Sequence, residues 1–199
     1  MTQLLAGFNG TIKKAQNKVL AEKIKYASLG QRKAAQTFKE ATTSKLVLTA
    51  HGLVTGQTIV FTSLPNETSG LVTGRLYWVT ATTNEIELAE NEGGAKLTWT
   101  ALGAEGCVLQ RVLECTAIKA RIPITLAQVG DGFAEDATSF AIETTGAQTG
   151  ENSITDVLFF EALTAGELLG GYCLPSKLEE SAAAVVTILS IKANNLVAP

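Results

Sequence analysis

The chain has 199 residues, of which 46% are hydrophobic and 18% charged, with three cysteines, one histidine and a formal net charge of −3. This composition excludes a disordered chain, and the length allows a core that needs neither disulfides nor a metal ion. The odd number of cysteines without a C-x-x-C pair excludes a full disulfide framework and argues against a zinc site, and no apolar run is long enough to cross a bilayer.

The first 44 residues are predicted to form a basic arm. Residues 1–40 hold eight Lys or Arg against two Glu, a charge of +6, so the remaining residues must carry −9. From Thr11 to Tyr26, apolar residues recur at steps of three and four, which predicts a short amphipathic helix. Residues 27–44 follow as a polar connection or an irregular strand.

Such an arm could bind an acidic protein surface, or it could be only a solvated helix face followed by a polar linker. Aromatic residues are too scattered within it to stack on bases, so direct nucleic-acid binding is not expected. The candidate partner-binding residues of the arm are Lys13, Lys14, Lys18, Lys23, Lys25, Arg32 and Lys33.

Residues 45–106 predict a small antiparallel β-module. Val, Ile, Thr, Tyr and Trp fill its apolar runs, whereas Gly, Asn and Pro fill the gaps between them. Pairs such as Pro65-Asn66 and Gly93-Gly94 tolerate the backbone angles of a tight reversal. Short strands with regular turns favour a small barrel or sandwich. We expect the strands near residues 45–50, 57–62, 75–81, 84–89 and 95–100.

Residues 107–199 predict a β-sandwich domain. Pro123 lacks a backbone donor, which places its strand at an edge or a bulge, and the glycine-rich run Gly166–Gly171 is typical of a hairpin connection. The alternation in residues 183–191 leaves both faces apolar, so we expect that strand to be central or at an interface. The longer strands are expected at residues 108–114, 115–127, 139–145, 154–163 and 183–191.

The fold class predicted from these elements is mainly β. An antiparallel β-sandwich or jelly-roll-like body would carry a small β-barrel or sandwich module and a short N-terminal helix.

The sequence predicts no catalytic, cofactor-binding or metal-binding residues. His51, the only histidine, lies in a His-Gly-Leu turn, where a structural role is expected. Glu85 and Glu87 share one strand face, which a solvated edge explains. The loop 130–136 is the best calcium candidate, but it lacks the ligand spacing of an EF-hand. We therefore expect a protein that is not an enzyme and holds no cofactor.

The module resembles a β-module of tailed-bacteriophage virion proteins, whose pattern runs "AHGL..G..V.F", "GL..G..Y.V" and "N...LA...GG". The resemblance implies a virion component. It is carried by Ala50, His51, Gly52, Leu53, Gly56, Phe61, Gly70, Leu71, Gly74, Tyr77, Val79, Asn84, Leu88, Ala89, Gly93 and Gly94.

The last third of the chain resembles a phage structural family described as tail-fibre-like, whose pattern runs "I.F......G.ITHVGLFDA.TGGNLLFYGAL" and closes on "V.AG..LTI". The family's usual opening strand, "YIGLHTADP", is absent here. The matching residues are Thr155, Asp156, Val157, Phe159, Phe160, Ala162, Gly166, Leu168, Leu169, Gly171, Tyr172 and Leu174.

These resemblances, the small size of the chain, the absence of predicted catalytic chemistry and the oppositely charged arm together favour a capsid decoration or cement protein that binds across major capsid subunits. It would be made in the host bacterial cytoplasm, lie in the virion, and assemble as a homo-oligomer, with a trimer favoured. A tail, baseplate or fibre-associated protein is the first alternative. The second is a carbohydrate-binding β-module in which exposed Trp78 and Trp99 stack on sugars.

Overall fold

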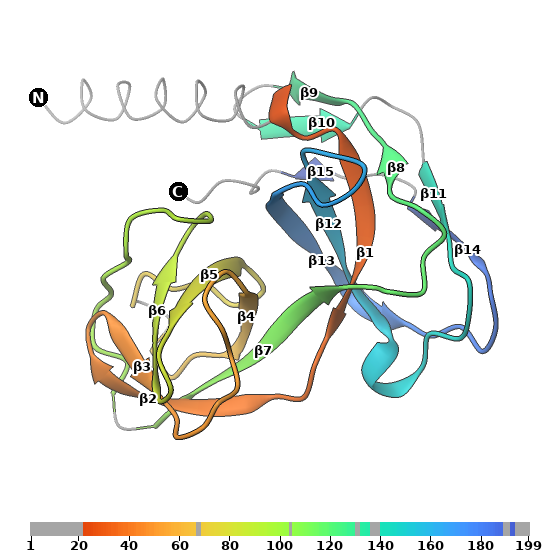
Figure 1. Cartoon of the computed structure of the whole chain (residues 1–199). Coiled ribbons are helices and arrows are strands. Elements are labelled where there is room, and N and C mark those ends of the chain that lie inside the picture. Colours follow the sequence, from red (N-terminus) through yellow and green to blue (C-terminus); the bar gives the residue numbers. More distant parts are fainter. Residues whose placement is uncertain are drawn as a thin grey trace, which may run out of the picture.

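The structure, a computed structural model, describes residues 22–66, 69–103, 105–129, 132–135, 140–188 and 192–193. These residues form two antiparallel β-bodies that share one long strand (Figure 1). One body is a closed barrel, and the other is an open sheet flanked by two smaller sheets.

The barrel closes on itself through its own backbone. Its strands follow the order β7-β2-β3-β6-β5-β4, and β4 pairs back onto β7. Its members are β2 (Gln36–Thr42), β3 (Lys45–Val47), β4 (Thr58–Ser63), β5 (Leu76–Ala81), β6 (Glu85–Ala89) and β7 (Cys107–Glu114).

The barrel interior is filled by side chains that alternate inward along these strands, as the period of two in a strand requires. Phe61 and Tyr77 meet edge to face, with ring centroids 5.5 Å apart. Glycines with positive φ make the tight turns between strands: the N–H of Gly56 donates to Val79 O, and that of Gly74 donates to Phe61 O, each at 2.9 Å. The fully buried members include Phe38, Leu46, Ile59, Phe61, Ile86 and Leu109.

The open sheet grows from the barrel through β7. Residues Cys107–Leu109 of β7 pair with β2, and residues Val112–Glu114 pair with β1. From there the sheet continues to β12 and ends at β13, while β8 also pairs with β1. The strands beyond β7 are β1 (Tyr26–Arg32), β8 (Ile122–Pro123), β12 (Ile154–Phe160) and β13 (Leu168–Leu178).

Two smaller sheets complete the described structure. One holds β9 (Leu126–Val129), β10 (Gly132–Glu135) and β15 (Lys192–Ala193). The other pairs β11 (Phe140–Glu143) with β14 (Val185–Ile188). A short 3-10 helix, η1 (Gly150–Asn152), leads into β12.

Three hydrophobic clusters form the core, one in each body and one that joins the two bodies. One fills the barrel, and a second packs Leu29, Val157 and Phe159 beneath the open sheet. The third lies between the bodies, where Trp78 and Leu158 belong to the same buried cluster. Because this junction is packed with apolar side chains, the barrel is not free to swing on a linker.

The mainly antiparallel β character predicted from the sequence is confirmed. The predicted module, residues 45–106, supplies β3 to β6 of a six-stranded barrel that β2 and β7 complete. The β-sandwich assignment for residues 107–199 stays a prediction. Four of the five strands expected in the module are present, whereas residues 95–100 contribute only an isolated bridge at Lys96. Pro123 lies in β8, which pairs only with β1 among the described strands.

Two expectations for the N-terminal part differ from the structure or fall outside the description. The helix expected over residues 11–26 lies almost entirely outside the described residues, and Tyr26 begins β1 instead. Residues 27–44, expected as a polar connection or an irregular strand, hold most of β1 and all of β2, which are both regular strands. Small residues let β1 fit closely against β12: a Cβ on Gly30 would lie 2.9 Å from that of Asp156.

The C-terminal third departs from expectation at two further points. The run Gly166–Gly171 is a connection only at its start, because β13 begins at Leu168 and pairs with β12. The strand at residues 183–191, expected to be covered on both faces, pairs with β11 alone among the described strands, and Val185 is 62% exposed.

Candidate functional site

An open groove of about 450 Å³ lies where the open sheet leaves the barrel. Both bodies contribute to its walls, and its lining combines polar and apolar surface, with three cationic residues and one acidic residue. The lining residues are Arg32, Lys33, Ala34, Gln110, Gly150, Glu151, Ser153, Thr155, Leu174, Ser176 and Lys177.

The floor of the groove is an ion pair between Arg32 of β1 and Asp156 of β12. The guanidinium donates from Nε and Nη2 to the two carboxylate oxygens at 2.9 and 2.8 Å. The Asp156 side chain is 1% exposed and that of Arg32 17%. Burial lowers the pKa of Arg32, but the hydrogen bonds and charge of Asp156 outweigh it and the pKa is raised. The guanidinium of Arg32 is therefore held in its charged form.

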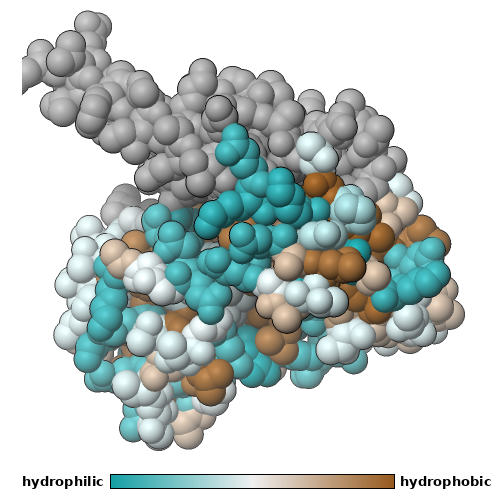
Figure 2. Space-filling view, turned by 45° about the horizontal axis from the view of Figure 1, so that its top comes forward, coloured by the Kyte–Doolittle hydropathy of each residue, from teal (hydrophilic) through white to brown (hydrophobic). Residues whose placement is uncertain are grey.

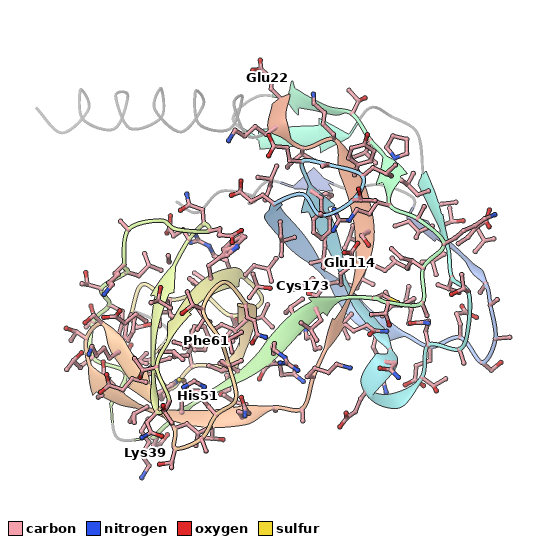
Figure 3. All side chains as sticks on the ribbon, viewed as in Figure 1. Glu22, Lys39, His51, Phe61, Glu114 and Cys173 are labelled. Atoms are coloured by element: carbon pink, nitrogen blue, oxygen red, sulfur yellow. The ribbon has the colours of Figure 1, made fainter. Side chains whose placement is uncertain are left out.

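Cys173 links the same floor to the barrel. Its Sγ accepts from Arg32 Nη2 at 2.7 Å and donates to Gly74 O of a barrel loop at 2.6 Å. Burial, together with the nearby charge of Asp156, raises the pKa of this thiol to about 12. Figure 3 shows Cys173 where β13 faces the barrel. Because its pKa is raised, the thiol bridges the two bodies as a neutral group.

Two lysines on different elements form the rim of the groove. Lys33 follows β1, and its Nζ donates to Asn152 Oδ1 at 3.2 Å. Lys177 of β13 pairs with Glu179 at 2.7 Å, and both side chains are well exposed. Hydrogen bonds from Lys177 and Ser153 lower the pKa of Glu179. The rim thus carries cations that water can reach.

A buried amide network positions the wall formed by η1. Gln31 Nε2 donates to Gln148 Oε1 at 2.7 Å and to Asn152 O at 2.6 Å. The thiol of Cys115 donates to the same Gln148 oxygen at 2.9 Å. Burial raises the pKa of Cys115, so the thiol keeps the proton that it donates.

The predicted arm residues do not form one cluster. Lys13, Lys14 and Lys18 lie outside the described residues. Lys23 and Lys25 are exposed just before β1, whereas Arg32 and Lys33 stand at its other end. A strand of this length separates the two groups by about 20 Å. Only Arg32 and Lys33 belong to the groove.

Sequence reasoning missed Gln110 and Lys177 as residues of the groove, and it missed the ion pair of Arg32 with Asp156. No local pattern could have found them, because Arg32 and Asp156 are 124 positions apart in the chain. Their meeting depends on the pairing of β1 with β12.

His51 occupies the structural position expected of it. It is 4% exposed, its Nδ1 accepts from Leu53 N–H at 3.0 Å, and its ring lies 5.5 Å from that of Phe38. Its carbonyl oxygen accepts from Gln36 Nε2. Figure 3 shows it near one end of the barrel.

The two strand acids considered as a site form ion pairs with lysines. Lys45 pairs with Glu85 at 2.9 Å, and Lys96 pairs with Glu87 at 2.5 Å. The calcium candidate at 130–136 falls partly outside the described residues. Within the described ranges, no three His, Cys, Asp or Glu side chains are placed to hold a metal ion.

The tryptophans required by the sugar-binding alternative are buried. Trp78 is 4% exposed and lies in the junction cluster, and Trp99 is 5% exposed. The indole N–H of Trp99 donates to Glu40 at 2.9 Å. Neither ring can stack on a sugar in this structure.

The surface is polar over much of the face seen in Figure 2, with hydrophobic side chains in small groups. The large exposed hydrophobic residues among those described are Val54, Val72, Leu163 and Val185. Within the described part of the chain, none of the helical structure has the length and apolar character that a membrane span requires.

Comparison of the chain with protein-family models, with curated proteins and with solved structures found no match.

Proposed function

We propose that this chain is a non-enzymatic structural component of a tailed-phage virion, and within the virion a cement protein that binds across major capsid subunits. The proposal rests on the resemblances of residues 50–94 and 155–174 to phage structural families. The position of these residues in the fold supports it.

The observation that carries the proposal is that the resembling residues build the scaffold itself. Gly52, Gly56 and Gly74 hold positive φ at the turns of the barrel, and Phe61 and Tyr77 fill its interior. A pattern that specifies turns and core specifies a fold, and this fold is a stiff β-unit. A stiff unit is suited to a protein that binds neighbouring shell subunits together.

The second resemblance supports the same interpretation from the open sheet. Val157 and Phe159 of β12 fill the core beneath the sheet, while Asp156, immediately before Val157, anchors Arg32 of the groove. The two resembling segments meet in the junction cluster, which contains Leu76 of β5 and Phe160 of β12.

A closed homo-oligomer, with a trimer favoured, is part of the proposal. β14 pairs with a single described neighbour and exposes Val185, so this edge could be covered by a second copy. Gel filtration with light scattering should give three times the chain mass of 20.9 kDa. A monomer would reject the trimer.

Immunogold labelling of intact phage particles with antibodies against this chain tests the proposed function. Label distributed over the head is expected. Label confined to the tail would favour the tail or baseplate alternative, and unlabelled particles would reject a virion role. Heads that lack the chain should also break at lower temperature than heads that carry it, because a cement protein adds contacts between subunits.

A further inference from the structure

We infer that the groove at the junction receives an extended acidic segment of a neighbouring virion protein, an inference that rests on the proposed function. Four features of the groove carry it: the cations of the rim, the neutralised ion pair beneath it, the bulge in β13 and the polar groups that remain to bind a peptide.

The rim cations can accept new carboxylates. Lys33 is held by the neutral amide oxygen of Asn152, so a carboxylate would gain a charged partner without displacing one. Lys177 shares an exposed pair with Glu179, and such pairs contribute little and exchange easily. Glu151 is the single acid among the lining residues, against Arg32, Lys33 and Lys177.

The floor favours a carboxylate at the rim over a phosphate held deep in the groove. Phosphate recognition typically uses the bidentate fork of an arginine. In this groove the Nε and Nη2 donors of Arg32 are already taken by the two oxygens of Asp156, which also accepts from Thr155 Oγ1 at 2.6 Å. The cations that remain are the two lysines, which bind carboxylates as point charges.

A bulge in β13 favours a polypeptide as the carrier of those carboxylates. The register of β13 against β12 jumps from Cys173, opposite Asp156, to Leu178, opposite Ile154, so residues 174–177 have no partner on β12. Leu174, Ser176 and Lys177 of this bulge line the groove. An extended segment lying in the groove can therefore form hydrogen bonds with the backbone of the bulge.

The remaining polar groups fit a peptide. Gln110 uses its Nε2 on Lys33 O at 3.0 Å, which leaves its Oε1 to accept from a peptide N–H. Ser176 is exposed on the groove and can donate or accept. The lining includes no aromatic ring, which sugar or base stacking would use.

The test measures the anisotropy of a fluorescein-labelled peptide of alternating Thr and Glu, titrated with the purified full chain. We expect saturable binding that weakens with salt and is absent for the matching Thr-Gln peptide. Lys33→Glu and Lys177→Glu should each weaken binding about tenfold or more, because like charges would then face each other. Lys119→Glu is the matched control, since Lys119 forms an exposed pair with Glu143 away from the groove.

Equal binding of the Thr-Gln peptide, an equal loss in Lys119→Glu, or no binding would overturn the inference. Displacement of the peptide from the wild type by a low concentration of inorganic phosphate would also overturn the inference. Such a result would show that the groove is an anion site of a different kind. If antibodies label the particles but the chain does not bind the peptide, the groove is rejected as a peptide-binding site and the proposed function stands. Peptide binding without particle labelling would reject the virion role and with it this partner.

Discussion

The barrel and the open sheet are neighbours that are held together by different means. The barrel uses residues 36–114 and closes through its own backbone, with glycine turns and an apolar interior. The open sheet joins β1 to β12, which lie at opposite ends of the chain, and it adds buried polar contacts such as Arg32 with Asp156 and Gln31 with Gln148.

This difference shows where each region can tolerate change. A closed barrel has no free strand edge, so its stability depends on packing and on its turns. The open sheet ends at β13, and its distant segments are fixed by ion pairs and amide networks that lose much when one partner is removed. The groove lies at the boundary of the two regions, where both kinds of contact meet.

The largest effects should come from emptying either core. Phe61→Ala in the barrel and Phe159→Ala under the open sheet each remove a fully buried ring, which should cost about 3–5 kcal/mol of unfolding free energy. Both tryptophans belong to the barrel region, so their fluorescence during guanidinium unfolding follows that body. We expect both variants to shift one common transition, because β7 and the junction cluster couple the bodies. If Phe159→Ala did not shift the fluorescence transition, that result would show that the two bodies unfold independently.

A somewhat smaller effect should come from breaking the ion pair beneath the groove. Asp156→Ala leaves the largely buried Arg32 cation without its carboxylate, at a cost of about 3 kcal/mol in urea unfolding. Glu143→Ala removes an exposed pair with Lys119 and should cost about 1 kcal/mol or less. Equal losses in the two variants would contradict the structural role assigned to the Arg32–Asp156 pair.

The smallest effect is a pH dependence of the unfolding free energy that arises from Glu114. This residue is the last of β7 and pairs with Arg121. Burial tends to raise the pKa of Glu114, but the hydrogen bonds and charge of Arg121, with a contribution from the Ser28 hydroxyl, outweigh it, and the pKa falls below its ordinary value of 4.5. Its stabilising contribution is therefore present above pH 4.5 and is lost as the pH falls through the lower folded-state pKa.

Urea unfolding across that pH window measures this contribution. Glu114→Gln should flatten the fall in unfolding free energy, and Arg121→Gln should do the same because it removes the main cause of the lowered pKa. Arg121 also lies over the ring of Phe160, 3.5 Å from its centroid, so its variant should lose stability at neutral pH as well. An unchanged pH profile in Glu114→Gln would assign the dependence to other carboxylates.

The sequence predicted the barrel far better than the open sheet. Expected strands at residues 57–62, 75–81 and 84–89 match β4, β5 and β6 within one residue at each end. Strong β-formers and glycine turns are local signals, and consecutive strands such as β5 and β6 pair with each other. The local pattern and the final structure therefore agree there.

The open sheet shows the opposite case. β1 has the sequence YASLGQR, whose small and polar residues favour no strand, yet Ala27 and Ser28 are fully buried in it. The glycines of β13 suggested a connection, but Gly171 is needed because a Cβ there would lie 2.5 Å from Leu76 Cδ1. These residues make sense only against the segments that pack on them.

The sequence by itself determined that the chain is mainly antiparallel β, and it located most strands of the barrel and the residues of its turns. Only the tertiary structure decided that β1 is a central strand, that Arg32 meets Asp156, and that Lys33 and Lys177 share a groove. The physical reason is that alternation and turn geometry depend on neighbours in the chain. The environment of a buried polar side chain, in contrast, depends on a strand more than a hundred positions away.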